Sequence, residues 1–268
     1  MYAEPLDRVP LWLLFVALIA MSWAALEGGY RLGKWRHART AEEKDTPVGA
    51  MVGTILGLLA FMLAFTFGLA ANRFDARRQT VLEEANAIGT TYLRTRLLPE
   101  PQRSESARLL REYVDARVRG VEDGKVAEAI TRSEELYELL WAEAVRAAAR
   151  EPGPITGLYL QSLNEMIDLH AKRVQVGLRS RIPVSIWAAL LALALIGMAS
   201  VGYQAGLSAT RRSPAMLGLV LAFAGVLFLI ADLDRGHEGL LKVSQQAMVE
   251  LQRSMNAGKP WPGPPPTP

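Results

Sequence analysis

The sequence predicts an all-α, polytopic membrane protein. We expect four transmembrane helices in two pairs, with a helical cytoplasmic insertion between spans two and three. Hydrophobic residues make up 50% of the chain and charged residues 21%, so the two kinds must be segregated along it. Several long stretches carry no charge, and the longest exceeds the roughly 20 residues that cross a bilayer as a helix. Elsewhere apolar residues recur at helical intervals, and no segment alternates as a strand does.

The composition excludes several kinds of site. The chain has no cysteine, which excludes disulfides, thiolate catalysis and zinc sites built on sulfur. The formal charge of +3 is small and the basic excess lies beside the predicted spans, where it meets anionic lipid, so we expect no nucleic-acid partner. There is no Gly-rich loop after a strand, no nucleophile elbow and no two-His metal spacing. We therefore expect no enzyme activity, no catalytic residues, no cofactor and no metal.

The first transmembrane pair is predicted within residues 1–71. Its first span covers about residues 9–26, and the segment before it lacks the basic start of a cleaved signal peptide, so we expect it to be retained. A short basic connection should follow. The second span covers about residues 48–71, with Pro47 in its first turn, where a missing N–H costs nothing. No proline follows until Pro99, which predicts a helix that continues beyond the membrane surface.

One face of the second span combines small and aromatic residues at intervals of four. Gly49, Gly53 and Gly57 form two GxxxG steps, which let a neighbouring helix approach closely where lipid supplies no hydrophobic drive. Phe61 and Phe65 continue the same ridge. From the residues alone, the ridge suits ordinary helix packing within one subunit, and it also suits the lining of a shared opening.

A helical soluble insertion is predicted at residues 72–182. After the extension of the second span, proline- and glycine-containing turns separate three further helices with apolar stripes, at about residues 105–119, 125–150 and 155–181. We expect the last of these helices to continue directly into the third span.

Two groups of polar residues in the insertion resemble sites, but each has a simpler structural interpretation. The first group is Glu83, Glu84, Asn86 and Arg94, and the second is Asn164, Glu165, Asp168 and His170. The first is typical of a solvated or salt-bridged helix face. In the second, neither Glu165 nor Asp168 stands at a spacing that shares a helix face with His170, which argues against a metal site. We predict structural roles for both groups.

The second transmembrane pair is predicted at residues 183–233, with spans at about 183–207 and 213–231. Gly202 and Gly206 form a further GxxxG step and are expected to serve helix packing. A tight connection containing Arg211 and Arg212 should join the two spans.

The C-terminal part begins with two acidic residues at the end of the fourth span. Asp232 and Asp234 are expected to face water at the membrane surface, with helix capping or the attraction of ions as alternative roles. An amphipathic helix is predicted at residues 234–256. The remaining residues, 257–268, are rich in proline and are expected to form a disordered tail.

The segment at residues 57–78 (GLLAFMLAFTFGLAANRFDARR) resembles the second membrane helix of bestrophin channels. In those channels, large apolar side chains at intervals of four line a narrow neck, and an Arg–aromatic pair follows the span. Phe61 and Phe65 match two of the three neck positions, and Arg73 with Phe74 matches the pair. Gly57 stands at the third neck position in place of a bulky aliphatic residue.

The wider pattern is similar to the bacterial bestrophin-like domain family. The matching stretches are EANAIGTTYLR at residues 84–94, LNEMIDLHAKR at 163–173 and DLDRG at 232–236. This resemblance implies a homo-oligomer, pentameric as in bestrophins, in which the second helices surround an axial path for small, chloride-type anions. It makes Gly57, Phe61 and Phe65 the expected pore-lining residues. Besides anions, the expected partners are the lipid bilayer and further copies of the chain.

The charges near the spans predict the orientation. An even number of spans puts both termini on the side of the insertion, and more Lys and Arg residues flank the spans there than on the opposite side. By the positive-inside rule, we expect the insertion and the termini on the cytoplasmic side. The resemblance to the bacterial family implies that the membrane is a bacterial inner membrane. The alternative function is a non-conducting scaffold or signalling module that recruits a partner through the insertion.

Overall fold

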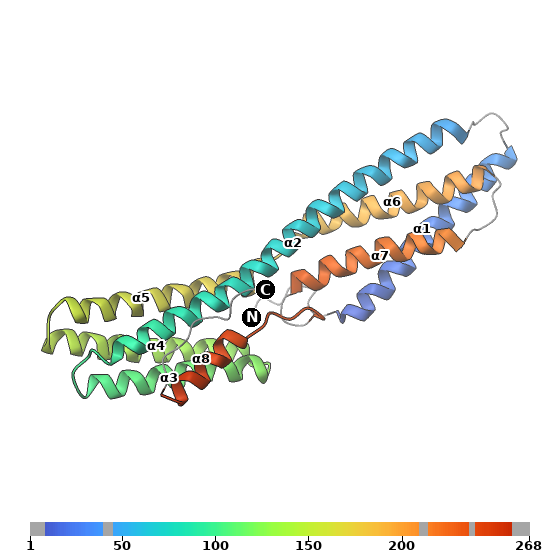
Figure 1. Cartoon of the computed structure of the whole chain (residues 1–268). Coiled ribbons are helices and arrows are strands. Elements are labelled where there is room, and N and C mark those ends of the chain that lie inside the picture. The colour runs from blue at the N-terminus through green and yellow to red at the C-terminus, as the bar shows by residue number, and fades with distance from the viewer. Residues whose placement is uncertain (1–8, 40–44, 209–213, 236–238, 259–268) are drawn as a thin grey trace. The chain divides into compact units, whose positions relative to one another are not determined.

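The structure, a computed structural model, describes residues 9–39, 45–208, 214–235 and 239–258 (Figure 1). Within these ranges every regular element is a helix, which confirms the predicted all-α class. The described residues form two compact units. The membrane unit contains the described residues up to Phe74 and those between Arg181 and Lys242. The helical unit contains Asp75–Ser180 and the described residues from Val243 onward.

The membrane unit is built from α1 (Leu11–Arg39), the first part of α2 (Asp45–Thr95), α6 (Val184–Leu207) and α7 (Pro214–Arg235). In the described part of the chain, these 4 helices are long and apolar enough to cross a membrane, as the sequence predicts. The helix α1 extends to Arg39, through basic residues that were expected to form a connection. Lys and Arg are good helix formers, and Arg31 stabilises this part by an ion pair of 2.8 Å with Glu27, one turn earlier.

The core of the membrane unit is apolar and close-packed. Leu59 and Leu63 of α2 lie among buried side chains of α6 and α7, including Trp187, Leu190 and Leu227. The outer surface of the unit is also apolar, with exposed side chains such as Trp12, Leu58 and Leu221. Helices that are hydrophobic all round suit a bilayer, where lipid covers the face that water would otherwise meet.

The helical unit contains the second part of α2, α3 (Gln102–Glu122), α4 (Val126–Arg150), α5 (Pro154–Val174), the π-helical turn η2 (Gln175–Arg179) and α8 (Gln246–Asn256). Its core joins apolar side chains from all five α-helices. Representative members are Ile88, Leu110, Leu140, Leu163 and Leu251, each fully buried. The amphipathic stripes that the sequence predicts for the insertion therefore face one another.

Two segments differ from the predicted helices. The helix expected at residues 155–181 ends at Val174, and after η2 the chain is not helical from 180 to 183. Pro183 explains the break, because proline disfavours the helical conformation in the residue before it. The amphipathic helix expected at 234–256 is shorter. α7 continues to Arg235, whereas residues 239–245 are not helical, and α8 covers only Gln246–Asn256.

Two further predictions concern residues outside the described ranges. These are the connection that contains Arg211 and Arg212 and the Pro-rich tail beyond Gly258.

Candidate functional site

The predicted pore face of α2 is uncovered within its own unit. The side chain of Phe61 is 65% exposed and that of Phe65 is 57% exposed. A Cβ added at Gly53 or at Gly57 would meet no atom within 4 Å. The ridge from Gly53 to Phe65 is thus a face that the described part of the unit leaves free for lipid or for another copy of the chain.

The other glycines singled out in the sequence lie against neighbouring helices. A Cβ at Gly202 would overlap the carbonyl oxygen of Leu26, and one at Gly206 would overlap that of Tyr30, so α1 and α6 approach backbone to backbone. Gly49 faces the side chain of Gln204, whose Nε2 would lie 2.8 Å from an added Cβ.

The helical unit contains a buried polar cluster centred on Glu84. This side chain, on α2, is 0% exposed. Arg117 of α3 donates to its Oε2 at 3.3 Å, and Arg173 of α5 donates to the same oxygen. The Tyr113 hydroxyl, one turn before Arg117, donates to Glu84 Oε1 at 3.0 Å and lies 2.9 Å from Nδ1 of His170. Three helices are therefore joined through one carboxylate.

The electrostatics of the cluster keep Glu84 ionised. Burial alone raises the pKa of Glu84, but the charges of Arg173 and Arg117 and the hydrogen bond from Arg173 outweigh it, so the pKa lies far below its ordinary value of 4.5. Burial, followed by the Glu84 charge, raises the pKa of Tyr113 well above its ordinary value. Two guanidinium groups and one carboxylate leave the cluster with a positive excess.

The polar groups singled out in the sequence are thus only partly brought together. Glu84 and His170 meet through Tyr113, whereas Glu83 forms a separate ion pair of 2.8 Å with Lys172. Asn164 donates to Asp168 at 3.2 Å on the exposed side of α5. No group of three metal-ligating side chains occurs in the described ranges.

Sequence reasoning missed the partners of Glu84. The signal that was present is the spacing of Tyr113 and Arg117 on α3, and of His170 and Arg173 on α5, since each pair lies about one helical turn apart on one face. Such spacing is common on solvated helices, so it does not by itself indicate a buried cluster.

The two aspartates after the fourth span do not face water as predicted. Asp232 is 1% exposed and Asp234 is 7% exposed. The Asp232 carboxylate accepts the backbone N–H groups of Leu240 and Leu241 at 2.7 and 3.1 Å, and Asp234 accepts that of Ile182 at 3.0 Å. These bonds hold the backbone of Leu240, Leu241 and Ile182 against the end of α7.

The comparisons with known proteins agree with this architecture. A family model described as the bestrophin-like domain matches residues 16–248. A solved crystal structure described as a membrane protein superposes with a TM-score of 0.67, covering 92% of this chain and 97% of that one, at 14% identity. At that identity the likeness shows a shared fold alone. No curated protein matches the chain. Because the family model covers most of the sequence, this multi-pass membrane protein belongs to the bestrophin-like family.

Proposed function

We propose that the chain is a homo-oligomeric anion channel of the chloride type, in which α2 lines the pore through Gly57, Phe61 and Phe65. The observation that carries this proposal is the uncovered ridge of α2, on which two large aromatic side chains follow Gly53 and Gly57, two glycines that meet nothing in the described part of their own unit. Small residues on a membrane helix allow close approach of another helix, so the row suits contact with a second copy.

The aromatic part of the ridge suits the passage of anions. A phenylalanine ring has a positive edge, so rings that point sideways into a pore tolerate an anion without binding it tightly. An apolar constriction can also close by losing its water. Gly57 would leave the corresponding level of the pore wider than the two levels formed by Phe61 and Phe65.

The family supports the remaining parts of the proposal. Bestrophins are pentameric anion channels, and membership in the bestrophin-like family makes the same assembly the expected one here. The positive-inside count supports a cytoplasmic location for the helical unit and the termini. The resemblance to the bacterial family supports a bacterial inner membrane.

Two measurements test the proposal. The mass of the purified chain in native lipid should be that of a ring of at least three subunits, and liposomes that contain it should release chloride. Phe61→Ala and Phe65→Ala should change the chloride flux, because each removes an aromatic side chain from the constriction. The matched control is Phe67→Ala, on the opposite side of the same helix. A monomer or dimer without flux for any small ion would contradict the channel.

A second candidate function is a non-conducting membrane scaffold that recruits a partner through the helical unit. It is favoured by exposed apolar side chains on α4 and α5, among them Leu139, Val145 and Leu158, because such side chains often mark binding surfaces. Crosslinking followed by pull-down, with and without residues 72–182, should then capture a partner that depends on this segment. A ring-shaped oligomer with chloride flux would argue against a scaffold as the main role.

A further inference from the structure

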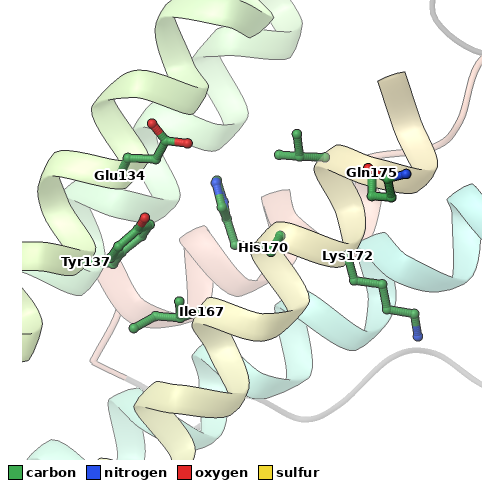
Figure 2. Close-up of a pocket in the computed structure, with 8 residues that line it drawn as sticks. Glu134, Tyr137, Ile167, His170, Lys172 and Gln175 are labelled. Carbon is green, nitrogen blue, oxygen red and sulfur yellow. The ribbon is translucent and has the colours of Figure 1, made fainter. Parts of the chain in front are cut away.

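The helical unit contains a pocket of about 490 Å³ beside α4 and α5, which the channel proposal does not use (Figure 2). Its lining includes Glu134 and Tyr137 from α4, Ile167, His170 and Lys172 from α5, and Gln175 from η2. Figure 2 shows the His170 ring standing off α5 into the space on the side of Glu134 and Tyr137, while Lys172 points away from it. His170 thus connects the buried Glu84 cluster to the pocket.

The hydrogen bonds of the cluster determine which nitrogen of neutral His170 carries the proton. An ionised carboxylate can only accept, so the single proton of the Tyr113 hydroxyl goes to Glu84 Oε1. The Tyr113 oxygen, 2.9 Å from His170 Nδ1, must then accept a hydrogen bond from that nitrogen. With its proton on Nδ1, neutral His170 has a lone pair on Nε2.

This lone pair is buried without a partner. His170 is 3% exposed, and in the part of the chain that the structure describes its Nε2 has no hydrogen-bond partner. A buried polar atom in this state is costly, and it is stabilised by any ligand that brings a donor to it. The half-buried Tyr137 ring, whose centroid lies 6.0 Å from that of His170, stands edge to face beside it. Tyr137 and His170 both line the pocket, so a ligand bound there lies beside the His170 ring.

The groups on the open side of the pocket favour a cation, whereas the positive excess of the Glu84 cluster is buried behind His170. The Glu134 side chain is exposed and carries a carboxylate. The pKa of Tyr137 is raised first by burial and then by the negative charges of Glu134 and Glu138. The positive charge of Lys172 is paired with Glu83 at 2.8 Å and does not face the space. Ile167 supplies apolar surface. The site therefore offers acceptors, negative charge and a short apolar wall.

We propose that this pocket binds a small organic ammonium ligand that donates an N–H to Nε2 of His170 and pairs its charge with Glu134. A primary alkylammonium group fits each observed property: it has N–H donors, a positive charge and an apolar body. A metal ion fits less well, because within the described ranges no group of three metal-ligating side chains is found, and protein zinc sites use at least three. The proposal is independent of whether the chain conducts anions.

The test uses the full chain in lipid nanodiscs with 15N-labelled histidine. The sequence contains only 3 histidines, so the His170 ring signals can be assigned with His37 and His237 substituted in turn. Without ligand, the spectrum should show a proton on Nδ1 and an unprotonated Nε2 in His170. Butylammonium should then shift the Nε2 signal saturably. Butyltrimethylammonium, which has the charge but no N–H, should bind at least tenfold more weakly.

Variants of exposed residues test the role of charge without disturbing the buried cluster. Glu134→Gln should weaken butylammonium binding at least fivefold. The matched control Glu138→Gln, on the same helix but outside the lining, should leave the affinity within twofold. The proposal is overturned if His170 carries its proton on Nε2, if butylammonium gives no saturable shift, or if both ammonium probes bind equally well.

Discussion

The hydroxyl of Tyr113 lies 3.0 Å from Oε1 of Glu84, and through it a fully buried carboxylate on α2 is linked to α3 and, by His170, to α5. Arg117 and Arg173 complete the ionic part of the same cluster. The charges are shielded from water, so the cluster is sensitive to the loss of any one member.

Glu84→Gln should destabilise the helical unit by about 3–5 kcal/mol, because it leaves two guanidinium groups buried without their carboxylate. Denaturant unfolding of the detergent-solubilised chain, followed by tryptophan fluorescence, measures the loss. The matched control is Glu83→Gln. Glu83 pairs with the half-exposed Lys172, so its loss should cost no more than about 1 kcal/mol. Equal losses for the two variants would show that the buried ion pairs do not stabilise the fold.

The lowered pKa of Glu84 predicts a specific loss of stability in acid. Since its folded-state pKa lies below the ordinary value of 4.5, the unfolded chain binds a proton more readily than the folded one. The stability that ionised Glu84 gives the folded chain is therefore present in full above pH 4.5. It is lost as the pH falls below that value toward the folded-state pKa. Unfolding free energies measured from pH 6 downward should decline more steeply for the natural chain than for Glu84→Gln. If the unfolding free energies of the two proteins fall in parallel with pH, Glu84 is not the cause of the loss of stability in acid.

Gly202→Ala should destabilise the membrane unit by about 1–3 kcal/mol, because the added methyl group overlaps the carbonyl oxygen of Leu26 and must separate α1 from α6. Gly28→Ala is the control, since a Cβ at that position of α1 meets nothing within 4 Å. Thermal unfolding in detergent compares the two. If both variants unfold at the same temperature as the natural chain, α1 and α6 do not approach backbone to backbone.

The transmembrane helices are the part of the fold that the sequence predicts best, because each must be long enough to cross the bilayer. Charge-free stretches longer than a membrane thickness must be helical spans, because a lipid environment leaves the backbone no other partner, and the four predicted spans are four helices of the required length. The helix boundary at Pro183 and the non-helical residues 239–245 were not predicted. The Asp232 carboxylate accepts hydrogen bonds from Leu240 and Leu241, which follow it by eight and nine residues, and the local pattern does not show such a contact.

The Glu84 cluster could not be predicted for a different reason. Glu84, Tyr113 and His170 are far apart in sequence, and each lies on a helix whose local pattern also fits a solvated face. Only the packing of α2, α3 and α5 decides that they meet. The ridge with Phe61 and Phe65 is visible in the sequence, but which surface covers it depends on further copies of the chain rather than on the order of its residues.

The most direct test of the central claim asks whether the Phe61 and Phe65 positions face water inside an assembly. The chain has no cysteine, so Phe61→Cys, Phe65→Cys and the control Phe67→Cys each introduce a single thiol. In liposomes, a charged, membrane-impermeant thiosulfonate should modify the first two and block chloride flux, and it should leave Phe67→Cys unmodified. If the thiols at 61 and 65 react only with a lipid-soluble maleimide, α2 faces lipid there and does not line a pore.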